Sequence, residues 1–207
     1  MEGVAWCANA MKAAQARLDV AADNLANAQT NGFRRHVVSF ELGSGGLRSR
    51  DVASGGAGAL RMTGRAFDLA VVGHGGLHVA ALSSANAQRA PIELTRGGSF
   101  ARSAQGYLID GHGRALLGEH GFVRLSDERA TIALDGAIVV DGRTLDRLAA
   151  VPGTRVQSGA LEGANVDSIR EMVSIVEAQR SFETAQKALT SIDSARSKAI
   201  NDMGKIQ

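Results

Sequence analysis

The chain of 207 residues carries 23 basic and 21 acidic side chains, a formal net charge of +2, with Lys and Arg scattered along it. This near balance without a basic stripe argues against a nucleic-acid-binding protein. No apolar run has the length of a signal-peptide core or a membrane helix, so we expect a protein that is either cytosolic or exported without a cleaved signal peptide. Only 4% of the residues are aromatic, so we expect part of the stability to come from neighbouring subunits.

The first predicted element is a helix over about residues 4–28. Large apolar residues recur every seven positions in it, at Val4, Met11, Leu18 and Leu25. A second row of small residues follows three positions after each of these, at Cys7, Ala14, Ala21 and Ala28. This heptad pattern predicts a helix that packs closely against a partner helix.

Polar residues and a glycine mark the end of this helix. Asn27 and Asn31 are expected to satisfy free backbone groups at the helix end. The Asn31-Gly32 pair predicts a turn. Phe33 is expected to pack back as an apolar anchor.

The composition of the chain changes after this helix, first at residues 41–59 and again at residues 60–155. Residues 41–59 contain six glycines and three serines, the composition of a flexible linker. Residues 60–155 contain short apolar runs separated by glycine, which predict a small all-β domain. The expected strands are 68–72, 106–109, 115–117, 131–134 and 137–140, with Asp-Gly turns at 110–111, 135–136 and 141–142.

The last predicted element is a longer helix over about residues 168–201. Ser168 and Glu171 have the spacing of a capping box. One row of apolar residues is Ile175, Phe182 and Leu189, and the other is Ala178, Ala185, Ile192 and Ala199. Ile192, Ala199 and Met203 have no evident partner in the shorter first helix, so we expect them to meet neighbouring subunits.

These elements predict an α+β fold, in which the two terminal helices pair as an antiparallel coiled-coil stem with the small β domain between them. The expected domains are a helical assembly domain of residues 1–40 and 160–207, a linker of 41–59, and a β domain of 60–155. The paired helices have few large side chains. We therefore expect their exposed faces to bury themselves against further helices, as in a polymer.

Several sequence blocks stand out along the chain. The amino-terminal block is LDVAADNLANAQTNGF at residues 18–33. Two middle blocks are TGRAFDLAVVG at 63–73 and TRGGSF at 95–100. The carboxyl-terminal blocks are LEGANV at 161–166, which contains Leu161 and Asn165, then EMV at 171–173 and AQRSFE at 178–183. In this order the blocks resemble the signatures of the bacterial flagellar rod and hook protein family, and most closely those of rod proteins of the FlgF/FlgG type.

The resemblance implies a structural subunit of the flagellar basal-body rod, which assembles its terminal helices into a tube with the β domain outside. It also implies type III export without a cleaved peptide, and a place in the periplasm-spanning rod. The implied partners are further copies of this chain, other rod and hook subunits, the export apparatus, and the surrounding rings or peptidoglycan. The short 41–59 segment favours the proximal over the distal rod member, and a hook or another axial protein is the alternative.

No pattern of catalytic or cofactor-binding residues emerges, so we expect no enzyme activity, no cofactor and no small-molecule substrate. His74 and His78 have a suitable spacing for metal ligands on a helix, but they fall where a turn leads into a strand. Four residues of a strand span about 13 Å, which is too far for one ion. Gly73 and Gly75 lack the third glycine of a dinucleotide-binding loop. A binding module or enzyme with helical dimerisation arms is therefore the weaker alternative.

Overall fold

The computed structural model describes residues 2–43, 46–82, 91–126 and 130–203. The chain divides into two compact units. Unit 1 consists of Met1–Ala28, Arg34–Gly55 and Val166–Gln207, and unit 2 consists of Gln29–Phe33 and Gly56–Asn165. Two helices in unit 1 and short strands in both units make this an α+β protein. The units differ from the predicted domains, because residues 41–55 belong with the helices and residues 160–165 with the β-rich unit.

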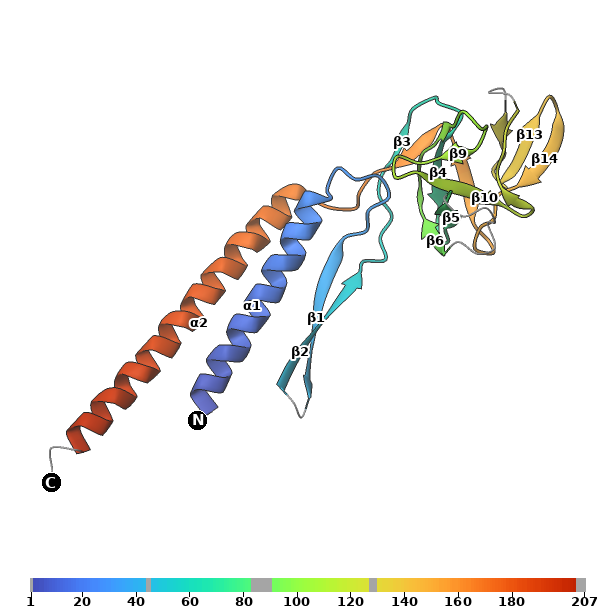
Figure 1. Ribbon diagram of the computed structural model, residues 1–207. Coiled ribbons are helices and arrows are strands. Elements are labelled where there is room, and N and C mark those ends of the chain that lie inside the picture. The colour runs from blue at the N-terminus through green and yellow to red at the C-terminus, as the bar shows by residue number, and fades with distance from the viewer. Residues whose placement is uncertain (1, 44–45, 83–90, 127–129, 204–207) are drawn as a thin grey trace. The chain divides into compact units, whose positions relative to one another are not determined.

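Unit 1 contains the two helices, α1 (Glu2–Ala26) and α2 (Ser168–Met203). They lie side by side, with the start of α1 and the end of α2 at the same end of the pair (Figure 1). The small residues of the predicted rows are buried between them, namely Ala14, Ala21, Ala178 and Ala185. Because each presents only a methyl group, the two helix axes can approach closely along this row.

Asp167 caps the amino end of α2. Its Oδ1 accepts hydrogen bonds from the backbone N–H groups of Ile169 at 3.0 Å and Arg170 at 3.2 Å. The predicted capping box of Ser168 and Glu171 is therefore wrong. The carboxylate of Glu171 is buried and paired elsewhere, so it is not free to turn back to the helix end.

A β-hairpin completes unit 1 where a flexible linker was predicted. β1 (His36–Gly43) pairs antiparallel with β2 (Gly46–Ala53), in a register that runs from His36 opposite Ala53 to Gly43 opposite Gly46. The hairpin lies alongside α1 (Figure 1), and the Arg17 guanidinium of α1 lies 5.2 Å from the ring centre of Phe40. The linker prediction is wrong for these residues, because contacts with α1 support strands that glycine content alone disfavours.

Unit 2 contains fourteen short strands within its described residues. They are β3 (Leu60–Met62), β4 (Asp68–Val72), β5 (Leu77–Ala81), β6 (Ile92–Thr95), β7 (Gly97–Ser99), β8 (Ala101–Arg102), β9 (Leu108–Ile109), β10 (Arg114–Gly118), β11 (Gly121–Phe122), β12 (Thr131–Ile132), β13 (Ala137–Val140), β14 (Arg143–Arg147), β15 (Arg155–Ser158) and β16 (Ala160–Glu162). The largest sheet has the order β6-β5-β10-β9-β8, with β11 also paired to β10. Three smaller sheets have the orders β12-β13-β14, β15-β4-β7 and β16-β3.

The predicted strands correspond to β4, β9, β10, β12 and β13, and the bounds of β4 and β13 are as predicted. The turn predicted at residues 141–142 is also confirmed. Val140 pairs with Arg143 across it, and Asp141 and Gly142 have positive φ angles of 47° and 78°. Two central residues with positive φ define a type I′ turn, which matches the twist of a hairpin.

The core of unit 2 is formed by aliphatic side chains from several sheets. Leu69 and Val71 of β4, Leu77 and Val79 of β5 and Leu116 of β10 are at most 1% exposed. Burying each such side chain contributes roughly 1.5–3 kcal/mol. The short strands are thus held together by one shared apolar cluster, although few of them form long ladders.

Candidate assembly site

The large apolar residues predicted for the helix seam lie on facing sides of α1 and α2 and are partly buried. They are Val4, Met11, Leu18, Leu25, Ile175, Phe182, Leu189 and Ile192. Ile192 was predicted to lack a partner in α1, but it lies against Gly3. A β-carbon placed on Gly3 would be 3.2 Å from Cδ1 of Ile192. The prediction is therefore wrong for Ile192, whereas Ala199 is exposed.

A hollow of about 290 Å³ lies beside two of these residues, Leu18 and Phe182. Its other lining residues are Ala14, Gln15, Gln179 and Glu183. The hollow is open to solvent, and the side chains of Gln15, Gln179 and Glu183 are exposed. It is therefore a surface groove beside the seam.

Asn24 is the central polar residue of unit 1 and is fully buried. Its Oδ1 accepts a hydrogen bond from the backbone N–H of His36 at 2.7 Å, and its Nδ2 donates to the carbonyl of His36 at 2.8 Å. The side-chain amide thus pairs with β1 as a neighbouring strand would. The same Nδ2 donates to Oε2 of Glu171 at 3.3 Å, so α1, β1 and α2 meet at this one side chain.

Glu171 is the buried acid of unit 1, at 1% exposure. Its Oε1 lies 2.6 Å from Nε of Arg35, and a buried carboxylate needs such a partner. The heptad pattern does not by itself indicate that Glu171 and Asn24 are buried. One signal was present, because Glu171 stands seven residues before Ala178 in the row that continues to Ala185. A charge in a buried small-residue row calls for a buried partner.

The residues predicted to end α1 lie in or just after its last turn. Nδ2 of Asn27 donates to the backbone carbonyl of Asp23 at 3.0 Å, a carbonyl that also accepts the backbone N–H of Asn27. Asn31 is exposed and lies in a turn. Gly32 has a positive φ of 73°, a conformation that glycine adopts without strain. Phe33 is partly buried, and the backbone N–H of Asn165 donates to its carbonyl at 3.3 Å.

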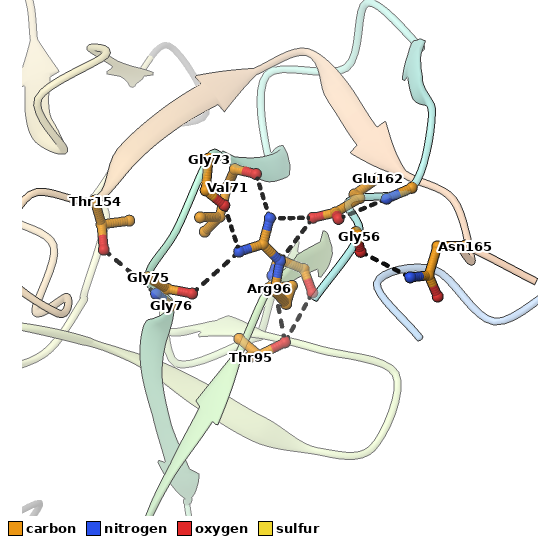
Figure 2. A network of polar contacts seen from close by, with 12 residues as sticks. Gly56, Val71, Gly73, Gly75, Gly76, Thr95, Arg96, Thr154, Glu162 and Asn165 are labelled. Carbon is orange, nitrogen blue, oxygen red and sulfur yellow. Dashed lines mark hydrogen bonds and ion pairs between the residues drawn. The ribbon is translucent and has the colours of Figure 1, made fainter. Parts of the chain in front are cut away.

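In unit 2, the blocks at residues 95–100 and 161–166 meet through an ion pair between Arg96 and Glu162 (Figure 2). Arg96 donates to Oε2 of Glu162 at 2.8 Å, and also to the carbonyls of Val71, Gly73 and Gly75. Glu162 is 3% exposed. The neighbouring residue Leu161, a predicted packing residue, is also 3% exposed. Two motifs that are far apart in the sequence therefore form one buried polar contact.

An exposed apolar stripe runs along the first part of α2. It consists of Ile169, Met172, Val173 and Val176, whose exposures lie between 46% and 75%. Their spacing of three and four residues places them on one face of the helix. The heptad rows describe only the face of α2 that meets α1, so they do not predict this stripe (residues 169, 172, 173 and 176).

Asp68 is a buried carboxylate at the start of β4. Burial alone would raise its pKa, but hydrogen bonds from Arg65, Thr63 and Ser99 outweigh that effect and lower the pKa below the ordinary value of 3.8. Nε of Arg65 lies 3.0 Å from Oδ2 of Asp68. A lowered pKa in the folded state means that folding favours the ionised form.

The stabilisation from Asp68 should therefore be present at neutral pH and lost as the pH falls below about 4, through the folded-state pKa. We expect Asp68→Asn to lower the stability of unit 2 at pH 7 and to make its loss below about pH 4 shallower. Urea unfolding of the full chain, followed by the fluorescence of Tyr107, measures this. An unchanged slope of stability against pH in Asp68→Asn would contradict the assignment.

Within the described residues, no helix is both long and apolar enough to span a membrane. The same part of the chain contains no cluster of three or more His, Cys, Asp or Glu side chains that could hold a metal ion. The features that stand out are therefore the helix seam with its hollow, the stripe, and two buried polar networks, all of which concern packing.

Two family models match the ends of the chain. Residues 7–34 match the flagella basal body rod protein model. Residues 157–202 match the model of the flagellar basal body rod FlgEFG protein C-terminal region. The first match covers most of α1, and the second covers most of α2 together with β16. The matched regions thus contain the helix seam except Val4, together with the stripe, Asn24 and Glu171.

Curated relatives extend the similarity over nearly the whole chain. The flagellar basal-body rod protein FlgF of Mesorhizobium japonicum is 26% identical, over 95% of this chain and 95% of the relative. FlgF of Salmonella typhimurium is 28% identical, over 87% and 89%. FlgG of Bacillus subtilis is 25% identical, over 92% and 95%. These relatives are named as rod proteins and not as enzymes, and together with the two family models they support a flagellar basal-body rod family for this chain.

Proposed function

We propose that this chain is a structural subunit of the flagellar rod that polymerises through unit 1. The observation that carries the proposal is the stripe. Successive helical residues are rotated by about 100°, so the stripe lies roughly half a turn around α2 from the buried row of Glu171, Ala178 and Ala185. A helix with apolar residues on opposite faces is typical of one buried on both sides. In the isolated chain one of these faces is in water.

Within this proposal, α1 and α2 form the antiparallel coiled-coil stem of the subunit. The buried alanine rows give the close contact between the two helices, and the partly buried large row lies at its margin. The hollow beside Leu18 and Phe182 accepts side chains from neighbouring subunits. The seam and the stripe then provide two surfaces for neighbours, as a helical tube requires.

The proximal part of the rod is the favoured position. Several relatives that cover most of the chain are named FlgF, and the distal alternative is supported by similarity to a FlgG. A hook protein is less favoured. The hook protein FlgE of Rhizobium meliloti is 34% identical, but over 52% of this chain and 28% of the hook protein. A binding module or enzyme with dimerisation arms is the least favoured, since the relatives carry structural names.

The remaining parts of the proposal follow from the similarity to this family. The chain is exported by the flagellar type III apparatus without cleavage and takes its place in the periplasm-spanning rod. There it contacts further copies of itself and other rod or hook subunits. The surrounding rings or peptidoglycan are the proposed contacts on the outer side.

Polymerisation of the purified chain tests the proposal directly. We expect light scattering to rise above a threshold concentration and negative-stain images to show rods or filaments. Basal bodies from a strain that lacks the protein should end at the proximal part of the rod. A chain that stays monomeric at millimolar concentration, together with complete rods in that strain, would overturn the proposal.

A further inference from the structure

Two short segments of unit 2, residues 29–33 and 56–59, form hydrogen bonds with residues 162–165 near the end of that unit. The first segment, residues 29–33, is held by Gly32, whose N–H donates to the backbone carbonyl of Glu162 at 2.8 Å. It is also held by Phe33, whose carbonyl accepts the backbone N–H of Asn165. In the second segment, residues 56–59, the carbonyl of Gly56 accepts Nδ2 of Asn165 at 2.7 Å.

Glu162 makes a further bond to the second segment through its side chain. Its Oε1 accepts the backbone N–H of Gly58 at 3.0 Å, while Oε2 is bound by Arg96 (Figure 2). Arg96 is 14% exposed and Glu162 3%. Hydrogen bonds to charged, shielded groups are stronger than those between neutral groups. The position of Gly58 is therefore coupled to the Arg96–Glu162 pair.

The backbone also fits tightly at this point. A β-carbon on Gly58 would lie 1.8 Å from the carbonyl oxygen of Gly163, far inside contact distance. The N–H of Gly163 donates to the carbonyl of Ala59 at 2.9 Å. Residues 58–59 and 163 are therefore in direct backbone contact, and glycine at position 58 is what allows it.

The side chains that make these contacts are polar, whereas the core of unit 2 is apolar. The buried core cluster draws on side chains such as Leu69, Val79 and Leu116, and Arg96 adjoins it, because its Nη2 donates to the carbonyl of Val71 at 2.9 Å. Loss of the polar contacts therefore removes no buried apolar area from β4, β5 or β10. The two sets of contacts can be separated experimentally.

We propose that Glu162 is the positioning residue of a latch that holds residues 29–33 and 56–59 against residues 162–165, at the end of unit 2. The latch consists of Gly32, Gly58, Arg96, Glu162 and Asn165. It opens without unfolding of the sheets, because its contacts are polar and Arg96 keeps its bonds to the carbonyls of Val71, Gly73 and Gly75 when Glu162 is released. This role goes beyond polymerisation and does not depend on it, since every contact lies within unit 2 of a single chain.

Glu162→Gln tests the latch in the dilute full-length chain. Gly58 and Arg96 donate to different oxygens of Glu162, and glutamine replaces one of these oxygens with an NH₂ donor, so one of the two contacts is lost. Arg96 retains its three carbonyl acceptors, which should preserve the sheets. We expect amide hydrogen exchange to rise about tenfold or more at Gly58, with a smaller rise at Gly32. Amides of β4, β5 and β10 should keep their native exchange rates.

Glu93→Gln is the matched control. Glu93 is also paired with an arginine, Arg114, at 2.6 Å, but its side chain is 55% exposed. The control should leave exchange at Gly58 and Gly32 unchanged. If Glu162→Gln fails to raise exchange at either amide, or raises it uniformly across the three strands, the latch is overturned.

A second pair of variants tests the latch through the backbone contact. Gly58→Ala places a methyl group against the carbonyl of Gly163 and should release residues 56–59 as Glu162→Gln does. Gly163→Ala is its control, because a β-carbon there meets only the carbonyl of Ala59 at 3.5 Å. Equal exchange at residues 56–59 in the two variants would count against the latch.

Discussion

Replacing Val173 by aspartate should prevent polymerisation while leaving the isolated chain folded. Val173 is 52% exposed in the single chain and lies in the middle of the stripe. A carboxylate buried unpaired in an apolar interface costs several kcal/mol. Each 1.4 kcal/mol is a tenfold change in an equilibrium constant, so we expect the threshold concentration for assembly to rise by about a hundredfold or more. Exposed substitutions change the stability of a chain by about 0.5 kcal/mol or less.

The matched control is Ala188→Asp, which adds the same charge at an exposed position of α2 outside the stripe. It should shift the threshold far less. Light scattering against concentration gives the threshold, and the helical circular dichroism signal gives the melting temperature. An unchanged threshold in Val173→Asp would remove the stripe from the assembly surface. A large fall in its melting temperature would mean that Val173 stabilises the single chain.

Asn24→Asp should have the largest effect on the stability of unit 1. The new side chain has nearly the same shape, but it loses the amide hydrogens that bind the carbonyl of His36 and the carboxylate of Glu171. It also places a second carboxylate next to Glu171 in a buried site. Breaking a buried charged network in this way typically costs about 3–5 kcal/mol. The result should be separation of β1 from the helices and loss of α1 protection.

The control is Asn31→Asp, the same chemical change at an exposed residue, which should alter stability by about 0.5 kcal/mol or less. Urea unfolding followed by helical circular dichroism measures both variants. Acid should partly restore the Asn24→Asp protein, because a protonated aspartic acid carries no charge and can donate one hydrogen bond. Equal stability of the two variants at neutral pH would show that Asn24 does not hold unit 1 together.

The elements that could be predicted are those with local signals. The heptad rows predict α1 and α2, since the spacing of Ala14 and Ala21 reports the contact face of a helix directly. β13 and its turn were predictable because Asp141 and Gly142 specify the hairpin. The hairpin of β1 and β2 could not be predicted in the same way, because its partner surface on α1 is not encoded within the segment.

The polar networks were also beyond reach for a physical reason. Asn24 and Arg35 are ordinary surface residues when considered alone, and the position of Glu171 in the small-residue row indicates burial but not its partners. Only their meeting across the two helices and the chain before β1 reveals the network. Arg96 and Glu162 lie in blocks that resemble family signatures, but the resemblance gives no pairing between the blocks. Their chemical roles depend on contacts between distant residues, which the spacing along one helix or strand does not report.

The strand pairs between the two ends of unit 2 determine when its folding can be completed. β16 pairs with β3, placing Leu161 opposite Arg61, and β15 pairs with β4, placing Gln157 opposite Ala70. A chain delivered amino end first presents β3 and β4 long before their partners. Closing such long loops is slow, and it cannot begin until the later strands have emerged. Unit 2 therefore cannot complete its final ladders until residue 162 has been delivered.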